Sequence, residues 1–214
     1  MKKTTLFIIV FGCVLFSFLT CPSQSWATYT STSPNLPQGQ YGSQSGFQSM
    51  YPQGIWIANV SHDHFTESFP PPPPGMNDMH TFPSQIDGLV SFNGVDYSPF
   101  STPASVTVFI ASGIDSGNIR NFNTEMLALD ASLGGGVMIR ESPTLASIGQ
   151  TSITDNGDGT YQISSFFDVF TELTIDGGIT WYPDQNGPAR MTLIPEPATI
   201  CLLGLGGILL RRRK

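Results

Sequence analysis

The chain of 214 residues holds nine basic and sixteen acidic residues, which gives it a formal net charge of −7. Six of the basic residues lie in its two ends, so the central residues carry fifteen acids against only Arg120, Arg140 and Arg190. Such a surface repels phosphate groups, which argues against nucleic-acid binding. All three cysteines also lie in the two ends, which excludes a disulfide scaffold, a thiolate metal site or a thiol enzyme in the central part.

Residues 1–27 have the pattern of a secretory signal peptide. Two lysines precede an apolar run over residues 6–19, and Ser25 and Ala27 place small side chains three and one positions before a cut at Thr28. We therefore expect an N-terminal signal helix that signal peptidase removes during export. A retained N-terminal anchor is the alternative.

The central part is predicted to contain a linker followed by one β domain. Residues 28–53 are rich in Ser, Gln, Gly and Pro without a periodic apolar pattern, which indicates a flexible linker. Residues 54–192 contain short apolar runs with alternation or β-branched side chains, separated by turn residues. This pattern predicts an all-β domain, an antiparallel sandwich or jelly roll. The prolines from Pro70 to Pro74 predict a stiff polyproline II loop, with a ligand for an aromatic groove as the alternative.

The three histidines, His62, His64 and His80, are candidate metal ligands. Residues two apart in a strand point to the same face, so His62 and His64 could chelate one zinc or copper ion, and His80 could complete the site. Ordinary loop histidines beside a proline-rich connection are the alternative. That alternative is the interpretation we adopt, so we expect no metal and no cofactor.

A cluster of carboxylate and amide side chains at residues 155–158 is a candidate calcium site. Asp155, Asn156 and Asp158 offer oxygen ligands within one turn, but a calcium ion needs six to eight such ligands. The glycines at 157 and 159 readily take the positive φ that a hairpin turn requires. A hairpin turn is therefore the favoured interpretation of this segment.

Residues 174–181, TIDGGITW, resemble the Asp box of sialidase propellers and other carbohydrate-active proteins. The matching positions are Thr174, Asp176, Gly178, Thr180 and Trp181. In those families the aspartate caps backbone amides of the turn and the tryptophan is buried beneath a hairpin. A propeller needs several copies at a fixed period, and this chain has a single copy. The resemblance therefore implies a β-hairpin and carries no information about hydrolytic activity.

The C-terminal residues contain an anchor too short for a stable membrane span. The 13 residues from Ala198 to Leu210 are largely apolar, yet as a helix they reach only ~20 Å across a hydrocarbon core ~30 Å thick. The segment is preceded by Pro195, Glu196 and Pro197. It is followed by the basic residues Arg211, Arg212, Arg213 and Lys214, which favour the cytoplasmic side.

The order of these three elements resembles the PEP-CTERM sorting signal of exported proteins from Gram-negative-type bacteria. The resemblance implies that residues 193–214 contain a short transmembrane helix, which holds the chain in the inner membrane until the transpeptidase exosortase removes it near the Pro-Glu-Pro motif. The sequence from residues 134–144 through residues 159–183 also resembles a β-rich module that recurs in proteins of this family and has no assigned activity. This resemblance covers roughly residues 86–214.

Together these features predict an exported, non-enzymatic protein of the cell envelope or extracellular matrix. We expect it to be a structural or binding component at the cell surface, with extracellular polysaccharide as the partner that the family suggests. A carbohydrate-binding or glycoside-cleaving protein is the alternative. Exposed Trp56, Trp181 and Tyr182 on one sheet face would favour binding, and two carboxylates ~5–9 Å apart in a cleft would favour cleavage.

Overall fold

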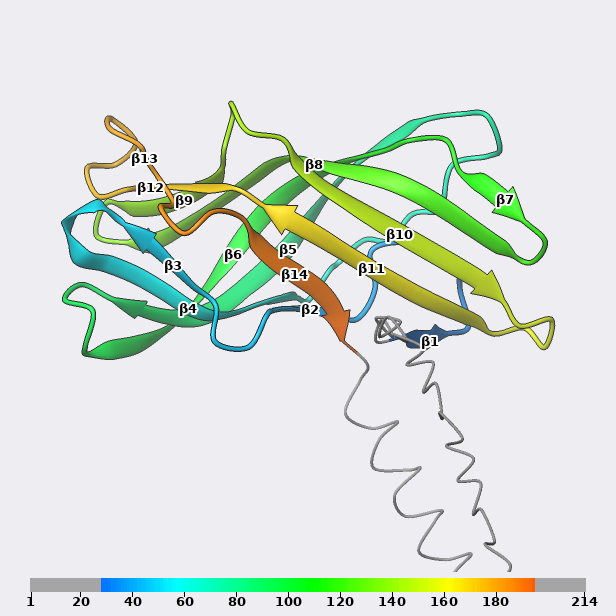
Figure 1. Ribbon diagram of the computed structural model, residues 1–214, viewed down its shortest axis with the longest axis horizontal. Helices are drawn as coiled ribbons and strands as arrows, with labels where there is room; N and C mark the ends of the chain where they lie inside the picture. Colours follow the sequence, from blue (N-terminus) through cyan, green and yellow to red (C-terminus); the bar gives the residue numbers. More distant parts are fainter. Residues whose placement is uncertain (1–27, 195–214) are drawn as a thin grey trace, which may run out of the picture.

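The computed structural model describes residues 28–194, which form an all-β structure (Figure 1). The strands are β1 (Tyr29–Ser31), β2 (Gln40–Ser43), β3 (Gln48–Tyr51), β4 (Ile55–Asp63), β5 (Asp78–Ser91), β6 (Tyr97–Ile110), β7 (Ile114–Ser116), β8 (Ile119–Gly134), β9 (Val137–Glu141), β10 (Ser147–Asp155), β11 (Tyr161–Val169), β12 (Thr171–Thr174), β13 (Tyr182–Pro183) and β14 (Ala189–Ile194). The one helical segment within these residues is a 3-10 turn, Pro52–Gly54. The all-β prediction is therefore confirmed.

Eight of the described strands close into a single barrel. In order around it they are β11, β14, β2, β4, β5, β6, β8 and β10, and every neighbouring pair is antiparallel. Strand β10 closes the ring because it pairs with β8 on one side and with β11 on the other. The antiparallel arrangement was predicted, but the expected sandwich or jelly roll was wrong. Both architectures alternate inward and outward side chains, so this pattern does not distinguish them.

The expected linker at residues 28–53 is also wrong, because it supplies three strands of the sheet. Strand β2 lies between β14 and β4 and is needed to close the barrel, while β1 pairs with β11 and β3 pairs with β4. Tyr41 and Tyr51 from this segment are buried, and the Tyr51 hydroxyl lies 2.6 Å from Thr171 Oγ1. Each of these strands is only three or four residues long. Strands this short among polar residues show no alternation of apolar and polar side chains from which they could be predicted.

The barrel interior is filled by alternate residues of the long strands. On β6 these include Val106, Val108 and Ile110, and on the neighbouring strand β8 they include Phe122 and Met126, all buried. An apolar cavity of about 80 Å³ remains in the interior, and Val106, Val108 and Met126 are among the residues that line it. Burial of such side chains stabilises the fold by about 1.5–3 kcal/mol for each large residue.

The polyproline segment lies in the connection between β4 and β5. Phe69, directly before the prolines, forms a two-way backbone bridge with Leu36, with N–O distances of 2.8 and 2.7 Å. Its ring lies 4.6 Å from the His80 ring, and Pro72 is fully buried. Phe69 and Pro72 thus hold the segment against the barrel.

Strands β9, β12 and β13 extend the sheet beyond the barrel at one end. Strand β9 continues from β8 through a tight turn, and β12 and β13 follow it in the sheet order. Figure 1 shows this extension at the end of the molecule away from β7. Among residues 28–194, no helix has the length and apolar character needed to cross a membrane. The predicted signal helix and C-terminal helix lie outside the described residues.

Candidate functional site

The β12–β13 hairpin carries the turn that resembles an Asp box. Asp176 Oδ1 accepts hydrogen bonds from the backbone amides of Ile179 and Thr180 at 3.0 and 2.9 Å. The Thr174 hydroxyl donates a third bond to the same oxygen at 2.6 Å. These hydrogen bonds lower the pKa of Asp176 to about 2. The bond from the Thr174 hydroxyl has the largest effect, and the bond from the Thr180 amide has the next largest. The carboxylate is therefore ionised at neutral pH and caps the turn.

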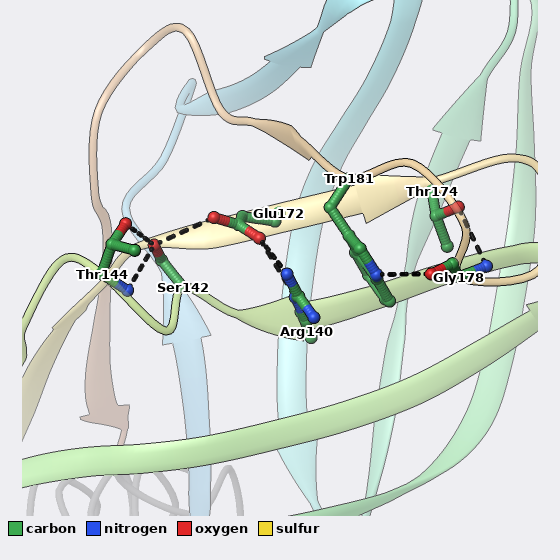
Figure 2. Close-up of polar contacts among 7 residues, drawn as sticks. All are labelled: Arg140, Ser142, Thr144, Glu172, Thr174, Gly178 and Trp181. Atoms are coloured by element: carbon green, nitrogen blue, oxygen red, sulfur yellow. Dashed lines mark hydrogen bonds and ion pairs between the residues drawn. The ribbon is translucent and has the colours of Figure 1, made fainter.

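Trp181 connects this turn to the neighbouring strand (Figure 2). Its indole Nε1 donates a hydrogen bond to the Gly178 carbonyl oxygen at 3.0 Å. The guanidinium carbon of Arg140, on β9, lies 4.0 Å from the centre of the Trp181 ring. Such a cation–π contact at a partly exposed position contributes about 0.5–1 kcal/mol.

Arg140 is held from its other side by Glu172 of β12. Its Nε and one terminal nitrogen both donate to Glu172 Oε2, at 3.0 and 2.7 Å, and the Ser142 hydroxyl lies 3.3 Å from Glu172 Oε1. Arg140 and Glu172 face each other in the β9–β12 register. We call Arg140, Glu172 and Trp181 the clasp, because together they join the hairpin to β9. Its charged groups are engaged with one another, which indicates a structural role.

A buried acid lies next to the clasp. Glu141 is almost fully buried, and its Oε1 accepts a hydrogen bond from the Ser147 hydroxyl at 3.0 Å. Burial is the largest cause that raises the pKa of Glu141 to about 7, and the nearby charges of Glu125 and Glu172 contribute to this rise. The burial of Glu141 could not be predicted from the sequence, because an acid next to Arg140 on a short strand is ordinarily exposed.

The structure does not bring the three histidines together. His62 points into the barrel, where its Nε2 lies 2.6 Å from Ser84 Oγ and burial lowers its pKa to about 4. His80 is buried against Phe69 and contacts Asp78 at 3.1 Å. The side chain of His64 is 70% exposed. The predicted shared face of His62 and His64 fails because β4 ends at Asp63 and His64 takes a positive φ of 51°, which breaks the strand alternation.

His64 instead lies beside two aspartates. One ligand atom each from Asp63, His64 and Asp87 lies within 4.8 Å of the others. Asp63 ends β4 and Asp87 lies on the adjacent strand β5. His64 was a candidate ligand from the sequence, but its place beside Asp87 could not be predicted, because strand pairing alone brings Asp87 to this position.

The acidic turn between β10 and β11 is occupied by its own hydrogen bonds. Asp155 Oδ1 accepts from the Gly157 amide at 2.8 Å, and Asp158 Oδ1 accepts from the Thr160 amide at 2.9 Å. The Asn156 side chain donates to the Thr160 hydroxyl at 2.9 Å. Strands β10 and β11 pair up to Asp155 opposite Tyr161, so the segment is a hairpin turn.

The three candidate aromatic residues do not form an open platform. Trp56, Trp181 and Tyr182 are each half-buried. Arg140 covers one face of Trp181, and a Cβ at Gly94 would lie only 3.0 Å from Trp56 Nε1, which shows how closely that loop packs on the indole. This arrangement does not supply the exposed stacking surface that carbohydrate binding would favour.

Residues 193–214 match the family described as PEP-CTERM protein-sorting motif. The chain therefore carries a PEP-CTERM sorting signal, which implies a secreted protein that exosortase processes in a Gram-negative-type bacterium. Of the matched residues the structure describes only the last two of β14, so the Pro-Glu-Pro motif, the apolar segment and the basic cluster lie outside the described residues. No curated protein and no solved structure matches this chain.

Proposed function

We propose that the exported part of the chain is a non-enzymatic structural or binding component of the cell envelope or extracellular matrix. The observation that carries this proposal is the filled interior of the closed barrel. Its cavity of about 80 Å³ is lined mainly by apolar side chains from many strands, and His62 and Thr171, two of its polar groups, are hydrogen-bonded to protein partners. A partner would therefore meet the outer surface.

The outer surface is acidic, and its cations are paired. Arg120 binds Asp115, Arg140 binds Glu172 and Arg190 binds Asp168, each with an N–O distance of 3.0 Å or less. Residues 28–194 contain no lysine. This charge disfavours anionic lipid headgroups as direct partners and is compatible with the proposed partner, a neutral or cation-bridged polysaccharide.

The sorting signal supports a transient stay in the inner membrane. Strand β14 ends at Ile194, directly before Pro195, so the sheet ends where the sorting motif begins. The proposed order of events is export, removal of residues 1–27 by signal peptidase, anchoring by the C-terminal helix and release of the barrel by exosortase. The cell surface or the matrix is the proposed destination.

A carbohydrate-cleaving or carbohydrate-binding protein is the competing function. The half-buried state of Trp56, Trp181 and Tyr182 counts against it, because stacking on a sugar needs an open aromatic face. Glu172 accepts two hydrogen bonds from Arg140, and this ion pair also counts against a role of the Glu172 carboxylate in acid–base chemistry.

The proposal is tested in the native host by fractionation and intact-mass measurement. We expect the protein in the surface or matrix fraction. Its mass should correspond to a chain that begins at Thr28 and ends near Pro195. We also expect that incubating the purified protein with the host's extracellular polysaccharide releases no reducing ends. A full-length tail in the membrane fraction of cells that possess exosortase contradicts the sorting scheme. Release of reducing ends above that of a heat-denatured control contradicts the non-enzymatic role.

A further inference from the structure

Asp63, His64 and Asp87 form a compact group on the outer face of the barrel, which we call the aspartate–histidine group. The residues beside the two aspartates, His62 on β4 and Ile86 on β5, are buried in the barrel, so alternation turns Asp63 and Asp87 outward. In the β4–β5 register Asp63 lies opposite Gln85, and Asp87 lies opposite Ser61. Asp63 and Asp87 are therefore near neighbours on one face of two paired strands.

The geometry of the group fits a single metal ion. Its ligand atoms all lie within 4.8 Å of one another. Carboxylate oxygens and imidazole nitrogens bind zinc at about 2.0–2.2 Å, so two ligands of one ion lie at most ~4.4 Å apart. The widest separation in the group therefore has to shorten by no more than about a few tenths of an ångström.

The charge of the group is not balanced by any arginine or lysine of the described part of the chain. The arginines there pair with other acids, namely Asp115, Glu172 and Asp168, and residues 28–194 hold no lysine. His64 Nδ1 contacts Asp63 Oδ1, and this contact offers at most one positive charge to two carboxylates. The two carboxylates repel each other at this distance, and a divalent cation bound between them would replace this repulsion with attraction to the ion.

Two glutamine side chains hold the aspartates in place. The Gln40 amide nitrogen donates to Asp63 Oδ2 at 3.0 Å, and the Gln85 amide nitrogen lies 3.3 Å from both oxygens of Asp87. Such outer hydrogen bonds orient metal-binding carboxylates and reduce the cost of bringing them together. They leave Asp63 Oδ1 as the oxygen that faces His64.

We propose that Asp63, His64 and Asp87 bind one divalent transition-metal ion of the zinc type. The imidazole favours such an ion over calcium or magnesium, which prefer oxygen ligands alone. To bind through Nδ1, His64 would carry its hydrogen on Nε2, and the ion would take the place of the contact between Nδ1 and Asp63 Oδ1.

The surroundings of the group leave room for further ligands of the ion. Asp63 and His64 line a surface pocket of about 490 Å³ together with Gln38, Gln40 and Ser68. Water, or an oxygen of a partner molecule, can therefore complete the coordination from this side. Tyr29 and Ile194 line the same pocket, so the site lies beside the strand that leads to the sorting motif.

The test is zinc binding to the purified full-length chain, measured by equilibrium dialysis with metal analysis. We expect one zinc ion per chain. We expect Asp87→Asn and His64→Ala each to weaken binding by at least about 100-fold, because loss of even an outer partner typically costs ~10–100-fold. The matched control is Asp155→Asn, which removes one charge from the acidic β10–β11 turn and should leave the affinity unchanged. Absence of stoichiometric zinc in the wild type, or equal binding by all variants, overturns the proposal.

A second measurement separates loss of the site from loss of the fold. Zinc at about 100 times its dissociation constant should raise the thermal midpoint of the wild type by about 5–10 °C. The Asp87→Asn variant should keep the metal-free midpoint of the wild type within a few degrees and show no rise with zinc. A rise with zinc in Asp87→Asn equal to that of the wild type would contradict the assignment.

Discussion

The guanidinium of Arg140 lies 4.0 Å from the ring centre of Trp181, between that ring and the carboxylate of Glu172 (Figure 2). This contact joins two segments about 40 residues apart and fixes the β12–β13 hairpin against β9. We expect Trp181→Ala to lower the free energy of unfolding by about 2 kcal/mol, from lost apolar contact and a lost cation–π interaction. Thermal and urea unfolding of wild type and variant provide the measurement.

The contribution of Arg140 to the clasp is tested by Arg140→Lys, with the same change at Arg120 as the control. Arg140→Lys keeps the charge but loses the flat stacking surface and the paired donors, so it should reproduce part of the Trp181→Ala loss. Arg120→Lys alters the more exposed pair with Asp115 and should cost no more than about 1 kcal/mol. Equal effects of the two arginine changes would show that the stacking on Trp181 contributes nothing.

Asp176 should make the stability of the hairpin depend on acid. Its pKa is lowered from 3.8 to about 2 by its bonds to Thr174 and Thr180, so the folded chain binds this proton less readily than the unfolded chain. The contribution of Asp176 is therefore fully present above pH 4 and is lost as the pH falls towards 2. Asp176→Asn should be less stable than the wild type at pH 6 and should lose less stability than the wild type between pH 4 and 2. Parallel unfolding curves over that range would contradict this role.

Glu141 and His62 should impose opposite pH dependences on stability. Burial raises the pKa of Glu141 from 4.5 to about 7, so the free energy of unfolding falls as the pH rises through this window. Burial lowers the pKa of His62 from 6.5 to about 4, so the free energy of unfolding rises with pH through that window. The two windows overlap, and the wild type should change little between pH 4.5 and 6.5.

Single variants should reveal each slope. With Glu141→Gln only the His62 contribution remains, and stability should increase from pH 4.5 to 6.5. With His62→Gln only the Glu141 contribution remains, and stability should decrease over the same range. Urea unfolding at three pH values measures both, and Glu67→Gln, at an exposed position, is the control that should retain the wild-type profile. Identical slopes in all four proteins would show that neither buried group titrates on unfolding.

Gly149 is required for closure of the barrel. A Cβ at this position on β10 would lie 2.3 Å from the Phe166 carbonyl oxygen and 2.8 Å from Thr124 Oγ1. Gly149→Ala should therefore lower the free energy of unfolding by about 3 kcal/mol or more, since the nearest atom is backbone and cannot move aside alone. Gly42→Ala on β2 is the matched control, because its Cβ would meet only Ile194 side-chain atoms at 3.8–3.9 Å. That change should be neutral or stabilise by about 0.4–1 kcal/mol. A Gly149→Ala protein as stable as Gly42→Ala would show that the strands separate readily here.

Local patterns in the sequence were sufficient for the β class, the sorting signal and the turns. Alternation and turn residues act over a few positions, so the hairpin at 155–160 and the capped turn around Asp176 could be predicted without knowing the fold. The PEP-CTERM motif is likewise a continuous segment, and it was recognised from the order of its three elements.

Only the tertiary structure decided the closure of the barrel, the strands within residues 29–51 and the partners of each charged side chain. Closure depends on β10 pairing with β8 and β11 at once, which no local pattern encodes. The same long-range pairing buried His62, turned His64 outward and brought Asp87 beside it. The physical reason is that side-chain direction follows from local alternation, whereas the identity of a neighbour across the sheet follows from register, and register is set by the packing of the whole core.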